Sequence, residues 1–97
     1  MSTLLKIQNW YKSQCDGTWE HTNGISIETL DNPGWHVSID IEKTRLNGKT
    51  FNHYEYGTNN GNNDWVSCKI ENGKFIAAAG PGKLEEILEI FIKWAEI

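Results

Sequence analysis

Hydrophobic positions first recur at helical spacing, between Thr3 and Gln14. The side chains that share this face are Leu4, Ile7, Gln8 and Tyr11, with Trp10 on its shoulder. Ser2 or Thr3 can cap the first turn, because short hydroxyl side chains accept from free backbone amides there. The pattern predicts a short helix, and Asp16-Gly17 predicts the turn that ends it.

From Thr18 to Gly80 the period shortens to two, which is typical of β-strands. The runs GISIETL and WHVSIDIE alternate apolar and polar residues, and NPG at residues 32–34 predicts a turn between them. One face of the second run holds Trp35, Val37, Ile39 and Ile41, and the other holds His36, Ser38, Asp40 and Glu42. This alternation indicates an antiparallel sheet with one buried and one wet face.

The runs DWVSCKIE and KFIAAAG flank Asn72-Gly73, which predicts a hairpin with a two-residue turn. Cys68 falls on the apolar side of its first strand, so we expect a small core residue. FNHYEY is a further strand candidate, and GTNNGNND after it reads as a polar loop.

The last segment, KLEEILEIFIKWAEI, predicts an amphipathic helix after the strand-breaking GPG. Its apolar stripe holds Leu84, Ile87, Leu88, Phe91 and Ala95, widened by Ile90, Trp94 and Ile97. The expected fold is therefore one α+β domain, residues 1–97. It has a helix, about five antiparallel strands in a meander of hairpins, and a helix packed on one sheet face.

The chain has 97 residues, a net charge of −4 and no basic run. Nucleic acid is thus not an expected partner, whereas a basic protein is. The start has no basic region followed by a long apolar run, so we expect neither a signal peptide nor a membrane span there. Without an export signal, the two cysteines are expected to be reduced thiols, and the expected compartment is the cytoplasm.

The stretch QCDGTWEH, residues 14–21, gathers a thiol, two carboxylates and an imidazole. A catalytic thiol needs a cationic neighbour or a helix N-terminus, but Cys15 follows a helix end and has Asp16 and Glu20 nearby. In a strand that starts near Thr18, Glu20 and His21 would face opposite ways. We expect a structural junction, with Trp19 packed at the strand's start, and keep an enzyme using Cys15 or His21 as the alternative.

No metal site or other cofactor is expected. The possible ligands lack any zinc-binding spacing, and they are Cys15, His21, His36, His53 and Cys68. The carboxylates Glu28, Asp40 and Glu42 read as solvated strand residues rather than as an acid–base pair.

The wet sheet face is the expected partner-binding surface. Its candidate residues are Glu28, His36, Asp40, Glu42, Glu55, Asp64 and Trp65, accompanied by Ser26, Ser38 and His53. Trp65 is out of phase with Val66, and an aromatic side chain among acids can anchor a partner. The alternative is that Trp65 packs under a loop or helix.

Three segments carry a family resemblance: WYKSQCDGTWEHTNGISIETLDNPGW, DWVSCKIENGKF and LEEILEIFIKWA. Together they resemble the immunity protein 53 family of bacterial polymorphic toxin systems, from Trp10 to Ala95, although residues 45–63 contribute little. The motif residues are Trp10, Tyr11, Cys15, Trp19, Glu20, His21, Asp31, Asn32, Pro33, Gly34 and Trp35.

The resemblance implies a cytoplasmic antidote that binds a cognate toxin and occludes it, without catalytic residues. If the toxin is a nuclease, its basic groove would complement the acids of the wet face. Another binding role, and a monomer or a weak homodimer through Ile90, Trp94 and Ile97, remain open.

Overall fold

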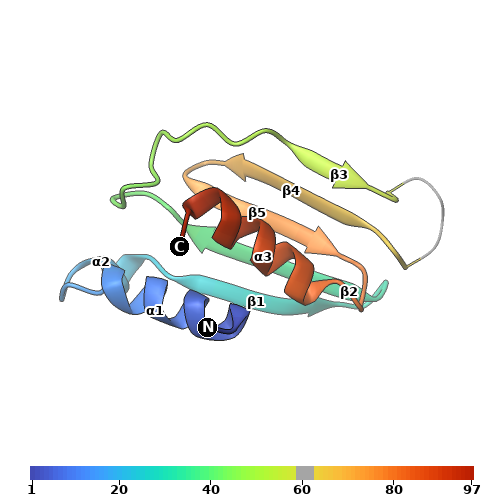
Figure 1. The fold of residues 1–97 in the computed structure, drawn as a ribbon, viewed down its shortest axis with the longest axis horizontal. Coiled ribbons are helices and arrows are strands. Elements are labelled where there is room, and N and C mark those ends of the chain that lie inside the picture. The colour runs from blue at the N-terminus through green and yellow to red at the C-terminus, as the bar shows by residue number, and fades with distance from the viewer. Residues whose placement is uncertain (59–62) are drawn as a thin grey trace.

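An antiparallel sheet of five strands, with helices on one of its faces, makes up the fold (Figure 1). This computed structural model describes residues 1–58 and 63–97. The elements are α1 (Thr3–Gln14), α2 (Trp19–Thr22), β1 (Ile25–Leu30), β2 (Gly34–Asp40), β3 (Tyr54–Tyr56), β4 (Val66–Glu71), β5 (Lys74–Ala79) and α3 (Leu84–Ala95). The expected α+β class is confirmed. The expected loop GTNNGNND lies partly outside the described residues.

The strands are ordered β1-β2-β5-β4-β3, so the chain builds two hairpins and joins them through β2 and β5. The β4–β5 hairpin turns at Asn72-Gly73, as predicted, and both residues have the positive φ that this turn needs, 52° and 73°. The β1–β2 hairpin turns over residues 31–33. Because β5 pairs with the second edge of β2, residues 41–53 carry the chain to the far side, where β3 pairs with β4.

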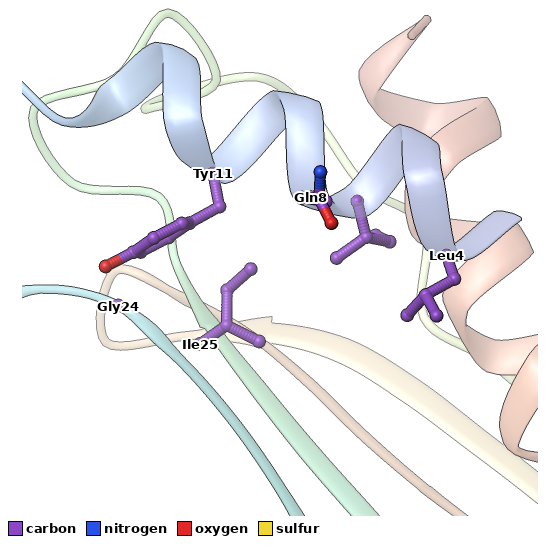
Figure 2. A pocket seen from close by; sticks show the side chains of 6 residues that line it. Leu4, Gln8, Tyr11, Gly24 and Ile25 are labelled. Carbon is purple, nitrogen blue, oxygen red and sulfur yellow. The ribbon is translucent and has the colours of Figure 1, made fainter.

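Helix α1 has the predicted bounds, and Ser2 caps it by accepting from the Leu5 amide at 3.1 Å. Its buried residues are Ile7 and Trp10, at one border of the predicted face. Leu4 remains 70% exposed and Tyr11 36%. Figure 2 shows Leu4 and Tyr11 pointing from α1 towards β1, with Ile25 between them. The outer part of this face therefore lines a groove instead of filling the core.

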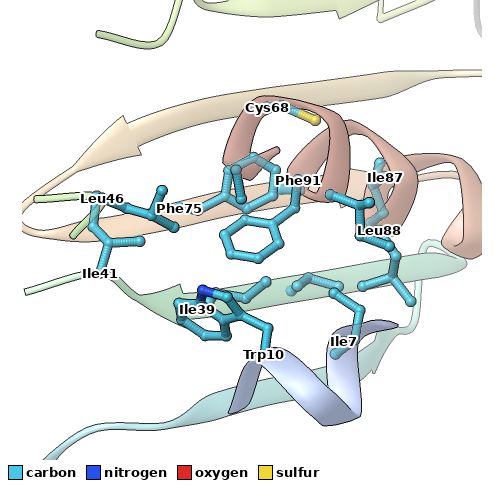
Figure 3. Close-up of a cluster of buried hydrophobic side chains, with 14 of the residues drawn as sticks. Ile7, Trp10, Ile39, Ile41, Leu46, Cys68, Phe75, Ile87, Leu88 and Phe91 are labelled. Carbon is cyan, nitrogen blue, oxygen red and sulfur yellow. The ribbon is translucent and has the colours of Figure 1, made fainter. Parts of the chain in front are cut away.

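The core lies between the sheet and the helices α1 and α3 (Figure 3). Aromatic rings occupy its centre: Phe91 packs edge-on against Trp10, with centroids 5.1 Å apart, and lies 5.3 Å from Phe75. Such tilted and edge-to-face contacts are the preferred arrangements of aromatic pairs. Cys68 is fully buried in this cluster, as the sequence predicts.

Helix α3 presents its apolar stripe to the sheet. Its buried residues are Ile87, Leu88, Phe91, Ile92 and Ala95. The side chains expected to form a homodimer contact, Ile90, Trp94 and Ile97, pack partly buried against the same core, and Trp94 Nε1 donates to the Thr50 carbonyl. Across residues 1–58 and 63–97, none of the helices combines the length and the apolar character that a membrane crossing would need.

Burial should separate the two thiols chemically. Cys15 is exposed, whereas burial, with a smaller effect of Glu86, raises the pKa of Cys68 to about 12. A thiol reagent at about pH 8 should therefore modify one cysteine of the native chain quickly and both after denaturation, because the thiolate is the reacting form. Mass spectrometry of the modified chain checks this, and rapid double labelling of native protein would contradict it.

Gly34 at the start of β2 should be sterically required. A Cβ there would lie well under 3.0 Å from the Ala79 carbonyl oxygen, whereas a Cβ at Gly24 would meet nothing within 4 Å. Gly34→Ala should therefore lower the free energy of unfolding by about 1–3 kcal/mol, and Gly24→Ala should change it little. Urea unfolding of both variants measures the difference, and equal stabilities would show that the backbone yields at Gly34.

Candidate functional site

The sheet face opposite the helices, here called the open face, is built by alternate residues of all five strands. Side chains of successive residues point to opposite faces of a strand, so the core positions define which residues face away. The open face holds Ser26, Glu28, His36, Ser38, Asp40, Glu55, Ser67, Lys69, Glu71, Lys74, Ile76 and Ala78. No helix or strand among the described residues covers it (Figure 1).

Charges on the open face are arranged in rows across the strands. One row runs Glu28, His36, Ala78, Ser67, Glu55, so its two acids lie on the edge strands β1 and β3. His36 Nδ1 lies 4.0 Å from Glu28 Oε1, and His53 Nε2 lies 3.5 Å from Glu55 Oε1. These weakly paired carboxylates leave negative charge along both edges of the face.

A second charged row runs Asp40, Lys74, Glu71. Asp40 binds Lys74 through Oδ1 and accepts from the Gly24 amide through Oδ2, at 2.8 Å for the amide. Lys69 lies 3.4 Å from Glu71. This row is largely neutralised from within, and Asp40 has a structural role in holding β1 against β2.

The predicted partner-binding residues divide into two groups. Glu28, His36, Asp40 and Glu55 share the open face. Glu42 lies in the loop after β2 beside Gly73, whereas Asp64 precedes Trp65 at the opposite end of the sheet and lies 3.9 Å from Lys83. Glu42 and Asp64 therefore lie too far apart to contact the same small group of a partner.

Trp65 lies at one end of the open face, where its indole ring packs over Gly34 and Gly80. Its carbonyl accepts from the Gly80 amide, and its ring lies 3.3 and 3.4 Å from where Cβ atoms of Gly80 and Gly34 would be. The indole is half-buried on this glycine floor. The ring thus packs on the sheet itself and keeps an accessible side.

Sequence reasoning missed the two lysines of the open face. Four carboxylates (Glu28, Asp40, Glu55, Glu71) and two lysines (Lys69, Lys74) give the face a formal charge of −2. The signal was present, because the alternation that placed Trp65 opposite Val66 also places Lys69 opposite Cys68. The face is therefore mixed in charge, with the acids concentrated at its edges.

The stretch QCDGTWEH forms a tight junction between α1 and the sheet. The strand expected from Thr18 is wrong: residues 19–22 form the short helix α2, and the first strand begins at Ile25. Asp16 Oδ1 accepts from the amides of Thr18 and Trp19, while the Glu20 carboxylate accepts from those of Asp16 and Gly17. This reciprocal capping favours a helical turn over an extended chain.

The side chains of this junction are occupied with local structure. Trp19 is buried, packs edge-on against Trp10 and donates from Nε1 to the Glu42 carbonyl at 3.0 Å. Cys15 Sγ lies 3.4 Å from the Tyr11 carbonyl oxygen, and His21 is exposed on α2. Both carboxylates are held by backbone amides, which ties the cluster to the junction between α1 and α2.

The second family motif, Asp31 to Trp35, forms the β1–β2 turn. Asp31, Asn32 and Pro33 are exposed, and Gly34 is buried. Trp35 Nε1 reaches across the sheet's end and donates to the Pro81 carbonyl at 2.9 Å. The motif therefore fixes the entry to β2 and the segment before α3.

The residues that could in principle bind a metal lie in different parts of the molecule. Cys68 lies in the core, His36 and His53 lie near the open face, and Cys15 and His21 belong to the junction. Within the ranges 1–58 and 63–97, no three His, Cys, Asp or Glu side chains come together as a metal site would require.

Acid should weaken the junction. Hydrogen bonds from the backbone amides of Trp19 and Thr18 lower the pKa of Asp16. The pKa of Glu20 is lowered by the Glu20 backbone amide and by the amides of Asp16 and Gly17. Because both pKa values are lowered in the folded protein, the two ionised carboxylates stabilise the fold fully at pH values above their ordinary pKa values of 3.8 and 4.5. This stabilisation is lost as the pH falls through the lower pKa values of the folded state. Asp16→Ala should therefore lower the melting temperature at neutral pH and differ less from wild type near pH 3. Circular dichroism measures this, and an undiminished difference in acid would contradict it.

The comparisons with known proteins give one match. The family model described as immunity protein 53 matches residues 4–96 of this chain. Searches of curated proteins and of solved structures give no significant match. Because the family match spans nearly the whole chain, the protein belongs to the immunity protein 53 family.

Proposed function

We propose that this protein is a cytoplasmic antidote that binds a cognate bacterial toxin and neutralises it stoichiometrically. The observation that carries the proposal is the family match over residues 4–96. Immunity proteins act as binding partners, so a free, shaped surface matters more here than a reactive group. The occupied carboxylates of the junction and the buried Cys68 are consistent with a non-enzymatic role.

The open face is the surface we propose for toxin contact. It is continuous across five strands, and a standard protein interface covers roughly 800 Å² on each partner. Glu28 and Glu55 mark its two edges, and Trp65 offers an aromatic side chain at one end. Interface hot spots favour tryptophan, particularly where neighbouring residues exclude water around it.

The charge of this face favours a basic partner. Its formal charge is −2, and its unneutralised acids lie at the edges, where a larger partner would meet them first. Complementary charge increases the association rate more than it increases affinity. A toxin with a basic substrate groove, such as a nuclease, would fit this description, and covering that groove would occlude it.

Reversing the edge charges should weaken protection. The double variant Glu28→Lys/Glu55→Lys should lower the association rate with the toxin roughly tenfold or more at low salt, and high salt should reduce the difference. Asp40 is unsuitable for this test, because it binds Lys74 and the Gly24 amide. The control matched in charge is Glu85→Lys/Glu89→Lys, at two exposed sites on α3 on the helical side.

The measurement needs a candidate toxin domain, to be sought in the gene neighbouring this one, co-expressed in bacteria and also purified. Colony survival reports protection, and surface plasmon resonance reports the association rate. If the control variant loses as much as Glu28→Lys/Glu55→Lys, the open face is not the contact surface. If the wild-type chain neither binds nor protects, the proposed function is wrong.

A further inference from the structure

The two edges of the sheet differ in how they are protected. At one edge β3 has only three residues, and short edge strands are one way in which proteins avoid unwanted pairing. At the other edge β1 has six residues and contains neither lysine nor proline. Its Ile27 side chain is 41% exposed. An edge strand of this length, with an exposed isoleucine and no lysine or proline, is available for pairing with another chain.

The register shows which backbone groups of β1 are free. The Gly24 carbonyl accepts from the Asp40 amide at 3.0 Å, and Ser26, Glu28 and Leu30 follow in the same phase. These residues therefore direct their backbone groups to β2. Ile25, Ile27 and Thr29 lie between them. Their N–H and C=O groups point outward, because the hydrogen-bonding direction of the backbone alternates from residue to residue along an antiparallel strand.

Hollows flank β1 on both sides of the sheet. On the helix side is an apolar groove of about 340 Å³ lined by Leu4, Ile7, Gln8, Tyr11, Gly24 and Ile25 (Figure 2). On the other side is a polar hollow of about 360 Å³, whose lining includes Glu20, Ser26, Ser38, Asp40 and Lys74. Gly24 and Ile25 line both hollows, so the start of β1 lies between them.

We infer that β1 accepts an extended segment of the toxin as a sixth strand, and that this segment alternates apolar and basic side chains. Main-chain bonds to Ile25, Ile27 and Thr29 would hold it, as in other cases of strand addition. Its apolar side chains would enter the groove under α1. Its basic side chains would lie beside Glu28, since Glu20 is held by backbone amides and Asp40 is already paired with Lys74.

Charge favours this occupant over a second copy of the chain. Two β1 strands paired about Ile27 would put the two Glu28 side chains on the diagonal, roughly 7–8 Å apart. Each copy also carries a net charge of −4. A segment with basic side chains on this face would instead be attracted by Glu28 and by the net negative charge of the chain.

The inference depends on the proposed function for the identity of the partner, but a peptide can test the edge alone. The probe is a blocked peptide of about six residues, the length of β1, alternating valine and lysine. Controls are the same composition without alternation, glutamate in place of lysine, and N-methylation of alternate amides. The full-length chain is labelled for NMR, and amide hydrogen exchange is followed residue by residue.

The alternating peptide should slow exchange at Ile27 and Thr29, whose amides point outward, and leave Ser26 and Glu28 nearly unchanged. None of the three control peptides should do so. Equal binding of the methylated peptide, or no protection by the alternating one, would overturn the inference. A dimer of the free chain with protected Ile27 and Thr29 amides would also overturn it, in favour of self-pairing.

Two variants with matched controls extend the test. Thr29→Pro removes an outward N–H without touching the β1–β2 ladder and should weaken peptide binding roughly fivefold, whereas Thr29→Ala should not. Ile27→Lys should repel the peptide, whereas Leu5→Lys, at a site on α1 of almost equal exposure (40%), should not. If Thr29→Pro does not fold, the Ile27 and Leu5 pair decides.

The toxin then separates the two proposals. Loss of protection by Ile27→Lys, with protection by Leu5→Lys, supports strand addition in the toxin complex. Full protection by Ile27→Lys overturns strand addition and leaves the antidote function in place. Failure of the wild-type chain to protect contradicts the function itself, whatever the peptide does.

Discussion

The pairing of β2 with β5 is the interaction on which the rest of the structure depends. Each strand belongs to a local hairpin, and their pairing joins the two hairpins into one sheet. It sets Ile39 beside Phe75 and Val37 beside Ala77, all fully buried under the helices. The central apolar surface that α1 and α3 cover exists only because these two strands are neighbours, and burial of such surface is the main driving force of folding.

The same pairing decides what the protein can present to a partner. With β2 and β5 in the centre, β1 and β3 become the edges, and the chain after β2 must cross to reach β3. Both long helices lie on one face, so no helix or strand of residues 1–58 and 63–97 covers the other face (Figure 1). The edge charges Glu28 and Glu55, the outward backbone of β1 and the groove under α1 are all consequences of this order.

In the junction of residues 14–21, side chains of reactive types are bonded to the local backbone. Asp16 and Glu20 each accept from two backbone amides, and Trp19 closes the end of the core while donating to Glu42. These bonds satisfy donors that would otherwise be left free where α1 ends and α2 begins. Asp16, Trp19 and Glu20 therefore fix the relation between α1 and the sheet.

Sequence patterns were enough to predict the helices α1 and α3, the β4–β5 hairpin at Asn72-Gly73 and the burial of Cys68. They also predicted the open-face positions of Glu28, His36, Asp40 and Glu55. Each of these follows from periodicity or from turn residues, which are local properties of the chain. No local pattern predicted that β5 lies beside β2, that Leu4 and Tyr11 line a groove, or that Trp65 covers Gly34 and Gly80. The helical turn into which Asp16 and Glu20 fold residues 19–22 was likewise not predicted. Alternation shows which way a side chain faces but not which strand is its neighbour, because that choice depends on surfaces brought together from distant parts of the chain.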